Sequence, residues 1–157
     1  MPGRGEDDPS FVRNALPAMV GDVNLFLSDE EDDAGEDGGI ADEISADAIE
    51  PGQKQGELSV MIAREDRRGK GMGTEASLLM MLYGAEKLGL RRFFVKIGED
   101  NVASRSMFEK ALGFRQCGYV KCFREVELEL RGETADEMAV TLRSLMKEEL
   151  VEWKCSV

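Results

Sequence analysis

The sequence predicts one α/β domain built around a mixed sheet, with the element order β-β-α-β-α-β-β-α. The 157 residues are 42% hydrophobic and 33% charged, which is the balance of a globular domain with one core. Several short stretches alternate apolar and polar residues as strands do, and stretches with a helical period stand between them. Together these patterns favour helices packed on a sheet.

The chain opens with a polar segment, residues 1–18, that combines proline, glycine and charge without a regular apolar period. We expect this N-terminus to be disordered. The first strand is predicted over residues 20–27, because Val23, Leu25 and Leu27 fall on one face at the period of a strand.

An acidic segment follows the first strand. Residues 29–50 contain eleven acids and neither Lys nor Arg, so removing them changes the net charge from −12 to −1. We interpret residues 28–55 as a disordered, solvated insertion in a hairpin connection. The alternative is an acidic docking segment for a basic partner. Because the remaining net charge is only −1, the folded domain should not repel anionic ligands in general.

A second strand is predicted over residues 57–62. A helix is predicted over residues 74–88, followed by Gly89 as its C-terminal cap. Its apolar residues form two adjoining stripes: Leu78, Leu82 and Ala85, and Ala76, Leu79, Met80 and Tyr83. The next strand covers residues 92–97. Residues 57–62 and 92–97 should therefore be parallel strands joined by a right-handed helical crossover.

The second half of the chain predicts a shorter helix, two strands and a final helix. The short helix covers residues 101–111, and four apolar residues are available for its buried side: Met107, Phe108, Ala111 and Leu112. The strands cover residues 114–121 and 123–130. An amphipathic helix is predicted over about residues 135–151, within a C-terminal helix and tail at 133–157.

The composition excludes several kinds of site. Histidine is absent, which rules out a Ser-His-Asp triad and His-containing zinc sites, and we expect no metal. Cys117, Cys122 and Cys155 lack the spacing of zinc or redox pairs, so we expect free thiols with structural roles. No apolar run approaches the ~18 residues of a membrane span, and no signal peptide is evident. We expect a protein of the cytoplasm or nucleus that binds neither membrane nor nucleic acid.

The turn before the first helix carries the most chemical information. Its eight residues are Arg67, Arg68, Gly69, Lys70, Gly71, Met72, Gly73 and Thr74. Glycines at alternate positions let successive backbone N–H groups point toward one ligand. A helix N-terminus beside them favours an anion, and the Arg and Lys side chains add positive charge. The turn therefore predicts a pyrophosphate site.

Two other interpretations of this turn remain. Residues 71–76 satisfy the G-x-G-x-x-A dinucleotide fingerprint, but the first glycine should end a strand, and a charged run at 64–70 intervenes. The acid that should hold the ribose is also displaced, because the nearest candidate, Glu99, stands beyond a glycine. The second alternative is a glycine-rich turn without a ligand.

Two motifs together resemble a known family. Residues 68–73 resemble the R/Q-x-x-G-x-G/A acyl-CoA loop of the GNAT acetyltransferase superfamily. Residues 101–104 and 108–114 resemble its second motif, N-x-x-S…F-x-K-x-G-F, with one more residue before the glycine. The order and spacing of the two motifs also agree with the family. The resemblance covers residues 20–130 and is to the ribosomal-protein N-acetyltransferase branch, and within it to the eukaryotic N-acetyltransferase 9 family.

The resemblance implies a GNAT fold, acetyl-CoA as co-substrate, and direct attack by an amine without an acyl-enzyme. The glycine turn would hold the pyrophosphate. The pantetheine arm would enter between the strands at 57–62 and 92–97, which splay apart in this family. Four residues would contact the arm: Met61, Ile62 and Ala63 through their backbone, and Asn101.

The resemblance also bears on the proton transfers. Glu57 matches a strand glutamate that serves as general base in related branches, and the alternative is a solvent-facing glutamate at a strand start. Phe108 stands where many relatives have a tyrosine that protonates the departing thiolate, so that role is not carried over. Because the reference pKa of a thiol is only ~8.5, water can protonate the thiolate instead. For Ser104 two interpretations remain open: a motif residue with a role in the site, or a helix residue without a chemical role.

The acceptor is implied by the resemblance alone. The branch suggests protein N-terminal α-amines, and the N-acetyltransferase 9 family suggests tubulin. The family normally has a strand, two helices and a further strand ahead of the elements found here. We therefore expect the domain at residues 19–132 to have an open sheet edge that a partner covers. The alternative function is a CoA-binding or partner-binding remnant without turnover.

Overall fold

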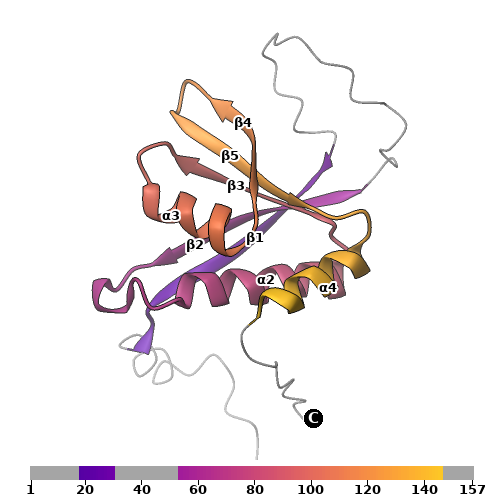
Figure 1. Cartoon of the computed structure of the whole chain (residues 1–157), viewed down its shortest axis with the longest axis horizontal. Coiled ribbons are helices and arrows are strands. Elements are labelled where there is room, and N and C mark those ends of the chain that lie inside the picture. The colour runs from indigo at the N-terminus through magenta and orange to yellow at the C-terminus, as the bar shows by residue number, and fades with distance from the viewer. Residues whose placement is uncertain (1–17, 31–52, 147–157) are drawn as a thin grey trace, which may run out of the picture.

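A computed structural model describes residues 18–30 and 53–146, which form a five-stranded mixed sheet with helices packed on it (Figure 1). The elements are β1 (Gly21–Asp29), β2 (Lys54–Ile62), the short 3-10 helix η3 (Glu65–Arg67), α2 (Met72–Leu88), β3 (Arg92–Gly98), α3 (Val102–Ser106), the π-helical turn η4 (Met107–Ala111), β4 (Arg115–Val120), β5 (Glu125–Arg131) and α4 (Ala135–Leu145). The predicted order and fold class are confirmed.

The strand order in the sheet is β1-β2-β3-β5-β4. β2 and β3 are parallel, as predicted, and the other neighbouring pairs are antiparallel. The segments at 1–17, 31–52 and 147–157 lie outside the described residues, so the predicted disorder of the N-terminus and of most of the insertion is not addressed.

The hairpin of β1 and β2 is longer than the sequence analysis predicted. The strands pair from Gly21↔Ile62 to Asp29↔Lys54, so both ends of the expected insertion belong to strands. The reason is a buried polar contact: Gln55 is 1% exposed, and its Nε2 donates to Ser28 Oγ at 3.1 Å.

Glu30, just after β1, also departs from the expectation of a solvated acidic segment. Its backbone N–H donates to the Gln53 carbonyl at 3.0 Å. Its carboxylate lies 3.2 Å from Arg131 Nη1 and 3.8 Å from Arg91 Nε, and its side chain is 4% exposed. Two arginines from distant segments therefore compensate the charge of this acid where the hairpin meets the rest of the sheet.

Helix α2 buries part of the surface that was expected. The stripe of Leu78, Leu82 and Ala85 is buried, as predicted. In the adjoining stripe Met80 packs against the core, but Leu79 and Tyr83 are 39% and 54% exposed. The other buried positions are Ser77, Met81 and Gly84. Because apolar residues surround this helix, their period alone does not specify which side meets the sheet.

The core lies between the helices and one face of the sheet, and α2 and α4 cross that face side by side (Figure 1). Strand residues on this helix-covered face include Leu58, Val60, Phe93, Val95, Ile97, Val126 and Leu128. Alternate residues point to the opposite face, which we call the polar face. It carries Gln55, Glu57, Ser59, Arg92, Phe94, Lys96, Glu127 and Glu129.

The predicted helix at 101–111 is instead α3 followed by the π-helical turn η4. The Leu112 N–H donates to the Met107 carbonyl five residues back, at 3.2 Å. Phe108 and Leu112 are buried as predicted, but Ala111 is exposed, because the wider turn rotates it away from the core. Gly113 then ends the turn with φ at +75°.

The final helix, α4, is shorter than expected. Thr134 caps it, since its side chain accepts from the Glu137 N–H at 3.1 Å. The helix ends at Leu145, and Met146 has extended backbone with ψ at 135°. Met146 still packs against the core and is partly buried, without the last helical turn that the periodicity suggested. Residues beyond 146 of the predicted helix lie outside the described part.

Replacing Gly84 with alanine tests the packing of α2 on the sheet. Alanine in a helix interior ordinarily stabilises by about 0.5–1 kcal/mol relative to glycine. Here the added Cβ would stand 2.9 Å from Cε1 of Phe93, whose side chain is fully buried. We therefore expect the variant to lose about 1–3 kcal/mol of unfolding free energy, measured by urea denaturation. Lys87→Ala on the exposed side of α2 is the control, and a stabilised Gly84→Ala would contradict this packing.

Candidate functional site: a slot between two parallel strands

The parallel pairing of β2 and β3 is short. The strands pair at Gly56↔Phe93 and Glu57↔Phe94, and the described strands then separate without further pairs. β1 continues to pair with β2 on its other side as far as Ile62. One edge of β2 is therefore free of a neighbouring strand beyond Glu57, which is the splay implied by the family resemblance.

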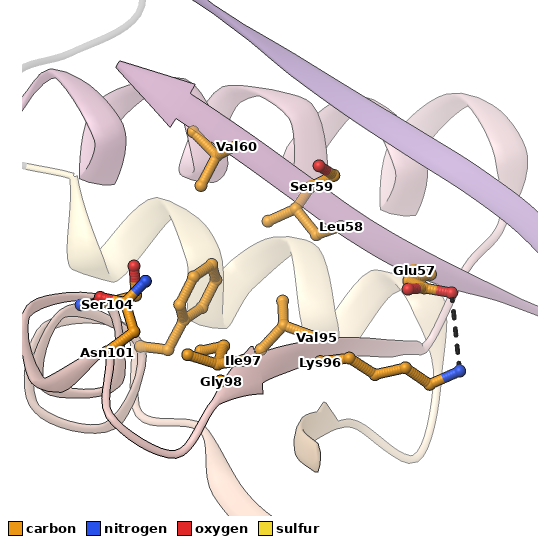
Figure 2. A pocket seen from close by; sticks show the side chains of 11 residues that line it. Glu57, Leu58, Ser59, Val60, Val95, Lys96, Ile97, Gly98, Asn101 and Ser104 are labelled. Atoms are coloured by element: carbon orange, nitrogen blue, oxygen red, sulfur yellow. Dashed lines mark hydrogen bonds and ion pairs between the residues drawn. The ribbon is translucent and has the colours of Figure 1, made fainter. Parts of the chain in front are cut away.

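A cavity of about 210 Å³ occupies this gap, and Figure 2 shows the side chains around it. It is lined by Glu57, Leu58, Ser59, Val60, Val95, Lys96, Ile97, Gly98, Asn101, Ser104 and Phe108. The lining residues of β2 and β3 alternate between the helix-covered face and the polar face. The cavity, which we call the slot, is thus bordered by side chains of both faces.

Glu57 and Lys96 lie at the end of the slot that adjoins the β2–β3 pairing, and both side chains are on the polar face (Figure 2). Glu57 Oε2 is 3.9 Å from Lys96 Nζ, and both side chains are about one-third exposed, at 36% and 35%. A ligand in the slot can therefore reach the carboxylate. Lys96 was not among the predicted site residues, although a single lysine among the apolar residues of a strand could have indicated it.

Asn101 and Ser104 stand at the opposite end of the slot in Figure 2. Asn101 Oδ1 accepts from the Ser104 N–H at 3.1 Å and so caps α3. This bond fixes the amide, and its Nδ2 has no partner among the described residues, so it can donate to a ligand. Phe108 closes the wall beside them: it is 2% exposed and packs edge-on against Phe114 at 5.1 Å.

The turn that carries Asn101 is anchored to the β4–β5 hairpin. Glu99 accepts from the Tyr119 hydroxyl at 2.6 Å and from Arg124 Nε at 2.6 Å. These two hydrogen bonds lower the pKa of Glu99, and the bond to Glu99 raises the pKa of Tyr119. The Glu99 N–H also donates to the Arg124 carbonyl at 2.9 Å, so the hairpin tip restrains this end of the slot.

The glycine turn leads from the end of β2 into α2. Gly69 and Gly71 have φ of +71° and +84°, which disfavours any residue with a Cβ. Added Cβ atoms at either position would meet nothing within 4 Å, so the outer side of the turn is open. The Glu75 N–H donates to the Gly71 carbonyl and begins the helix. The N–H groups of Met72, Gly73 and Thr74, in the first turn of α2, have no acceptor among the described residues and are available to an anion.

The turn is fixed to the end of β2. Arg68 Nε donates to the Ile62 carbonyl at 2.8 Å, and its Nη2 donates to the Ala63 carbonyl at 3.4 Å. Gly73 lies against Met107 of η4, since an added Cβ would be 3.3 Å from the Met107 sulfur. The turn is therefore held beside the same η4 segment that closes the slot.

The charges around the turn are unequally paired. Asp66 lies 2.9 Å from Arg64 and 3.5 Å from Arg67, and the hydrogen bond from Arg64 is the main cause of its lowered pKa. Lys70 has no carboxylate partner within the described residues. Its ammonium is therefore the cation of the turn that is most available to a phosphate.

The backbone groups of Met61, Ile62 and Ala63, which were expected to contact the pantetheine arm, point to different edges of the sheet. The Ala63 N–H points to β1, where it donates to the Val20 carbonyl at 2.8 Å. Successive strand residues direct their backbone groups to opposite edges, so Met61 also faces β1 while Ile62 and Val60 face the slot side. None of Met61, Ile62 and Ala63 lines the cavity, whereas Val60 does.

Glu57 and Asn101 do line the cavity. The predicted residues 67–74 form the turn between β2 and α2 and the first residues of α2. Sequence reasoning missed Leu58, Ser59 and Val60. A one-residue change of register decides which backbone groups of a strand face a ligand, and a motif does not fix that register.

Cys117 and Cys122 are free thiols, as predicted, while Cys155 lies outside the described residues. Cys117 is on β4, with its sulfur 3.5 Å from Glu127 Oε1. Partial burial, followed by the charges of Glu127 and Glu129, raises its pKa to about 12. This thiol is therefore protonated at neutral pH and is a poor nucleophile.

Two further classes of site are not found in the described chain. Residues 18–30 and 53–146 contain no group of His, Cys, Asp and Glu side chains that could hold a metal ion. No helix of this part is long and apolar enough to span a membrane.

The fold, the slot and the glycine turn together define a class of protein. A sequence profile of the acetyltransferase (GNAT) domain family matches residues 12–115, and the chain belongs to this family. It is 46% identical over 112 residues to alpha/beta-tubulin-N-acetyltransferase 9 of Mus musculus, which covers 71% of this chain and 38% of that protein. It is 42% identical over 115 residues to an N-acetyltransferase 9-like protein of Caenorhabditis briggsae, which covers 73% of this chain and 50% of that protein.

A solved structure supports the fold. Mycobacterium smegmatis RimJ, in complex with CoA-disulfide, superimposes with a TM-score of 0.50 at 20% identity over 62% of this chain and 50% of that chain. The chain spans half or less of the length of these relatives. The family resemblance, including its N-acetyltransferase 9 branch, is confirmed by these comparisons.

The raised pKa of Cys117 predicts slow alkylation. With a pKa of about 12, only ~10⁻⁴ of the thiol is ionised at pH 8, so we expect iodoacetamide to modify it at least about a hundredfold more slowly than an ordinary thiol. The rate should rise about tenfold for each pH unit up to pH 11. Peptide mapping by mass spectrometry measures this, with the exposed Cys122 as internal control. Equal rates for the two thiols in the folded protein would contradict the assigned environment.

Proposed function

We propose that this chain transfers an acetyl group from acetyl-CoA to a primary amine, namely a protein N-terminal α-amine, by direct attack in a ternary complex. The observation that carries the proposal is the slot between β2 and β3, which is lined from both faces of the sheet. Such a slot lets a thioester enter from the glycine-turn side and an amine approach from the polar face. The membership of the GNAT family supports acetyl-CoA as the donor.

The chain offers distinct groups for each part of acetyl-CoA. The open N–H groups at the start of α2 and Lys70, which has no carboxylate partner among the described residues, suit the pyrophosphate. Asn101 Nδ2, the backbone groups of Val60 and the N–H of Ile62, whose carbonyl already accepts from Arg68, suit the amide-rich pantetheine arm. One N–H on this edge of β2 would also stabilise the thioester oxygen as negative charge develops on it.

The reaction balances without an enzyme-bound intermediate. The neutral amine nitrogen attacks the thioester carbon, a C–N bond forms, and the C–S bond breaks to release the CoA thiolate. Glu57 accepts the proton of the amine, directly or through one water, and Lys96 holds the carboxylate at the end of the slot. Water protonates the thiolate, because Phe108 supplies no acidic proton on the opposite wall.

The acceptor follows from the relatives alone. The Mus musculus and Homo sapiens relatives are named alpha/beta-tubulin-N-acetyltransferase 9. We propose tubulin as the first protein acceptor to test and the cytoplasm as the compartment. The alternative is a remnant that binds CoA without turnover. Incubating the chain with acetyl-CoA and peptides that carry tubulin N-termini separates these functions.

Gly71→Val tests the glycine turn as the cofactor site. A Cβ at φ +84° costs roughly 1–2 kcal/mol, so the turn should rearrange and lower the affinity for acetyl-CoA by at least about tenfold. Isothermal titration calorimetry with acetyl-CoA and, separately, with NAD provides the measurement.

Gly89→Val is a matched control, because Gly89 has φ of +70° at the other end of the same helix and no neighbour within 4 Å of an added Cβ. It should destabilise the fold similarly and leave the affinity for acetyl-CoA unchanged. Binding of NAD alone, or an equal loss of acetyl-CoA affinity in both variants, would remove the glycine turn as the acetyl-CoA site.

Glu57→Gln tests the general base. We expect the rate to fall by about a hundredfold below pH 7, where most of the amine is protonated, and by less at higher pH, where the free amine is abundant. The affinity for acetyl-CoA should stay within about threefold, since Glu57 is at the other end of the slot from the glycine turn. The pH–rate profile is measured beside that of Asp136→Asn, an exposed acid in α4. A Glu57→Gln profile parallel to that of the wild type would assign Glu57 to a solvent-facing role.

A further inference from the structure

Alternate side chains of β3 form a short row on the polar face: Arg92, Phe94 and Lys96. The two cations flank one ring, since Arg92 Cζ is 5.0 Å and Lys96 Nζ is 5.5 Å from the centroid of Phe94. Phe94 is 3% exposed although it lies opposite the helix-covered face. This row runs along the place where β2 and β3 cease to pair.

Arg92 is a buried cation with partners on both neighbouring strands. It is 7% exposed, and its Nη1 donates to Gln55 Oε1 of β2. On the other side its Nε donates to Glu129 of β5 at 2.6 Å, and its Nη2 lies 3.5 Å from Glu127. A buried guanidinium needs several such partners, so its position is strongly determined.

Gln55 is equally fixed. It is 1% exposed, and its Nε2 donates to Ser28 Oγ at 3.1 Å and to the Asp29 carbonyl at 3.3 Å. These bonds orient its amide so that Oε1 faces Arg92. The contact therefore connects the β1–β2 hairpin to β3 through two side chains with little freedom to move.

The Arg92–Gln55 contact lies directly beside the short parallel pairing of β2 and β3. Gln55 precedes Gly56 and Glu57, the two β2 residues that pair with β3. At the other end of the pairing, Lys96 reaches Glu57. One side-chain bridge thus stands on each side of the short ladder, and β2 and β3 separate beyond it.

The core confines the same point from the opposite face. A Cβ at Gly56 would be 2.6 Å from Leu25 Cδ1, 3.1 Å from Leu90 Cδ1 and 3.3 Å from Phe93 Cδ1. β2 therefore cannot move closer to the core at Gly56. Its distance from β3 can be set by contacts on the polar face. Neither Arg92 nor Gln55 lines the cavity, so both can act on a ligand only through the strands.

We propose that Arg92 and Gln55 are positioning residues for acetyl transfer. Their hydrogen bond fixes the point at which β2 and β3 separate, and so fixes the width of the slot and the place of Glu57 at its end. This inference rests on the proposed function of the slot. It assigns a role in the reaction to a buried polar pair that touches neither substrate.

The test replaces Gln55 in two ways in the full chain. Gln55→Met removes the acceptor for Arg92, whereas Gln55→Glu keeps an oxygen in the same place. We expect Gln55→Met to lower kcat for peptide acetylation by about tenfold and to leave the affinity for acetyl-CoA within about threefold. Gln55→Glu should retain kcat within about threefold of the wild type.

A second measurement does not depend on turnover. Amide hydrogen exchange, read by NMR, should be at least about tenfold faster at the β2–β3 ladder in Gln55→Met than in the wild type or Gln55→Glu. Exchange in the β3–β5 ladder should be unchanged, because Arg92 keeps its partner Glu129. Arg143→Met is the matched control, since it breaks an ion pair between α4 and Glu86 of α2 far from the slot.

The outcomes separate the two proposals. If Gln55→Met exchanges like the wild type at residues 56, 57, 93 and 94, or loses no more kcat than Arg143→Met, the positioning role is wrong. If the wild-type chain acetylates no peptide, the proposed activity of this chain fails, and the exchange rates still decide whether the Arg92–Gln55 contact sets the slot.

Discussion

The interrupted pairing of β2 and β3 is the constraint on which the rest of this structure depends. β1 and β2 pair over nine residues and β3 and β5 over seven, but β2 and β3 pair at two positions and then separate. Backbone N–H and C=O groups must find partners, in protein or in solvent. A sheet that leaves one internal edge unpaired therefore has open backbone groups, and here they lie beside the cavity between Glu57 and Asn101.

Close packing on one face and charge on the other keep this interruption local. On the helix-covered face, Gly56 and Gly84 allow Leu25 and Phe93 to approach at distances that a methyl group would not permit. On the polar face, Arg92 links β2 to β5 through Gln55 and Glu129. Because the two paired positions of β2 and β3 are held from both faces of the sheet, the strands can separate beyond them without opening the whole sheet.

The site joins two features that lie at opposite ends of one strand. The glycine turn is bonded to the end of β2 through Arg68, and Glu57 stands where β2 leaves β3. Residues 57–60 of β2 line the slot between them. In the proposed reaction, one extended ligand such as acetyl-CoA would lie along β2, with its pyrophosphate at the N-terminus of α2 and its thioester near Glu57.

The sequence by itself determined the order of the elements, the parallel β2–β3 unit, the glycine turn and the two motifs that define the family. These features depend on local period and on residues such as Gly71, whose backbone conformation few others adopt. Only the tertiary structure decided that Leu79 and Tyr83 are exposed, that Val60 rather than Met61 faces the slot, and that Arg92, Gln55 and Lys96 surround its closed end. Each of these depends on register or on contact between distant segments, and a pattern along one strand or helix does not contain that information.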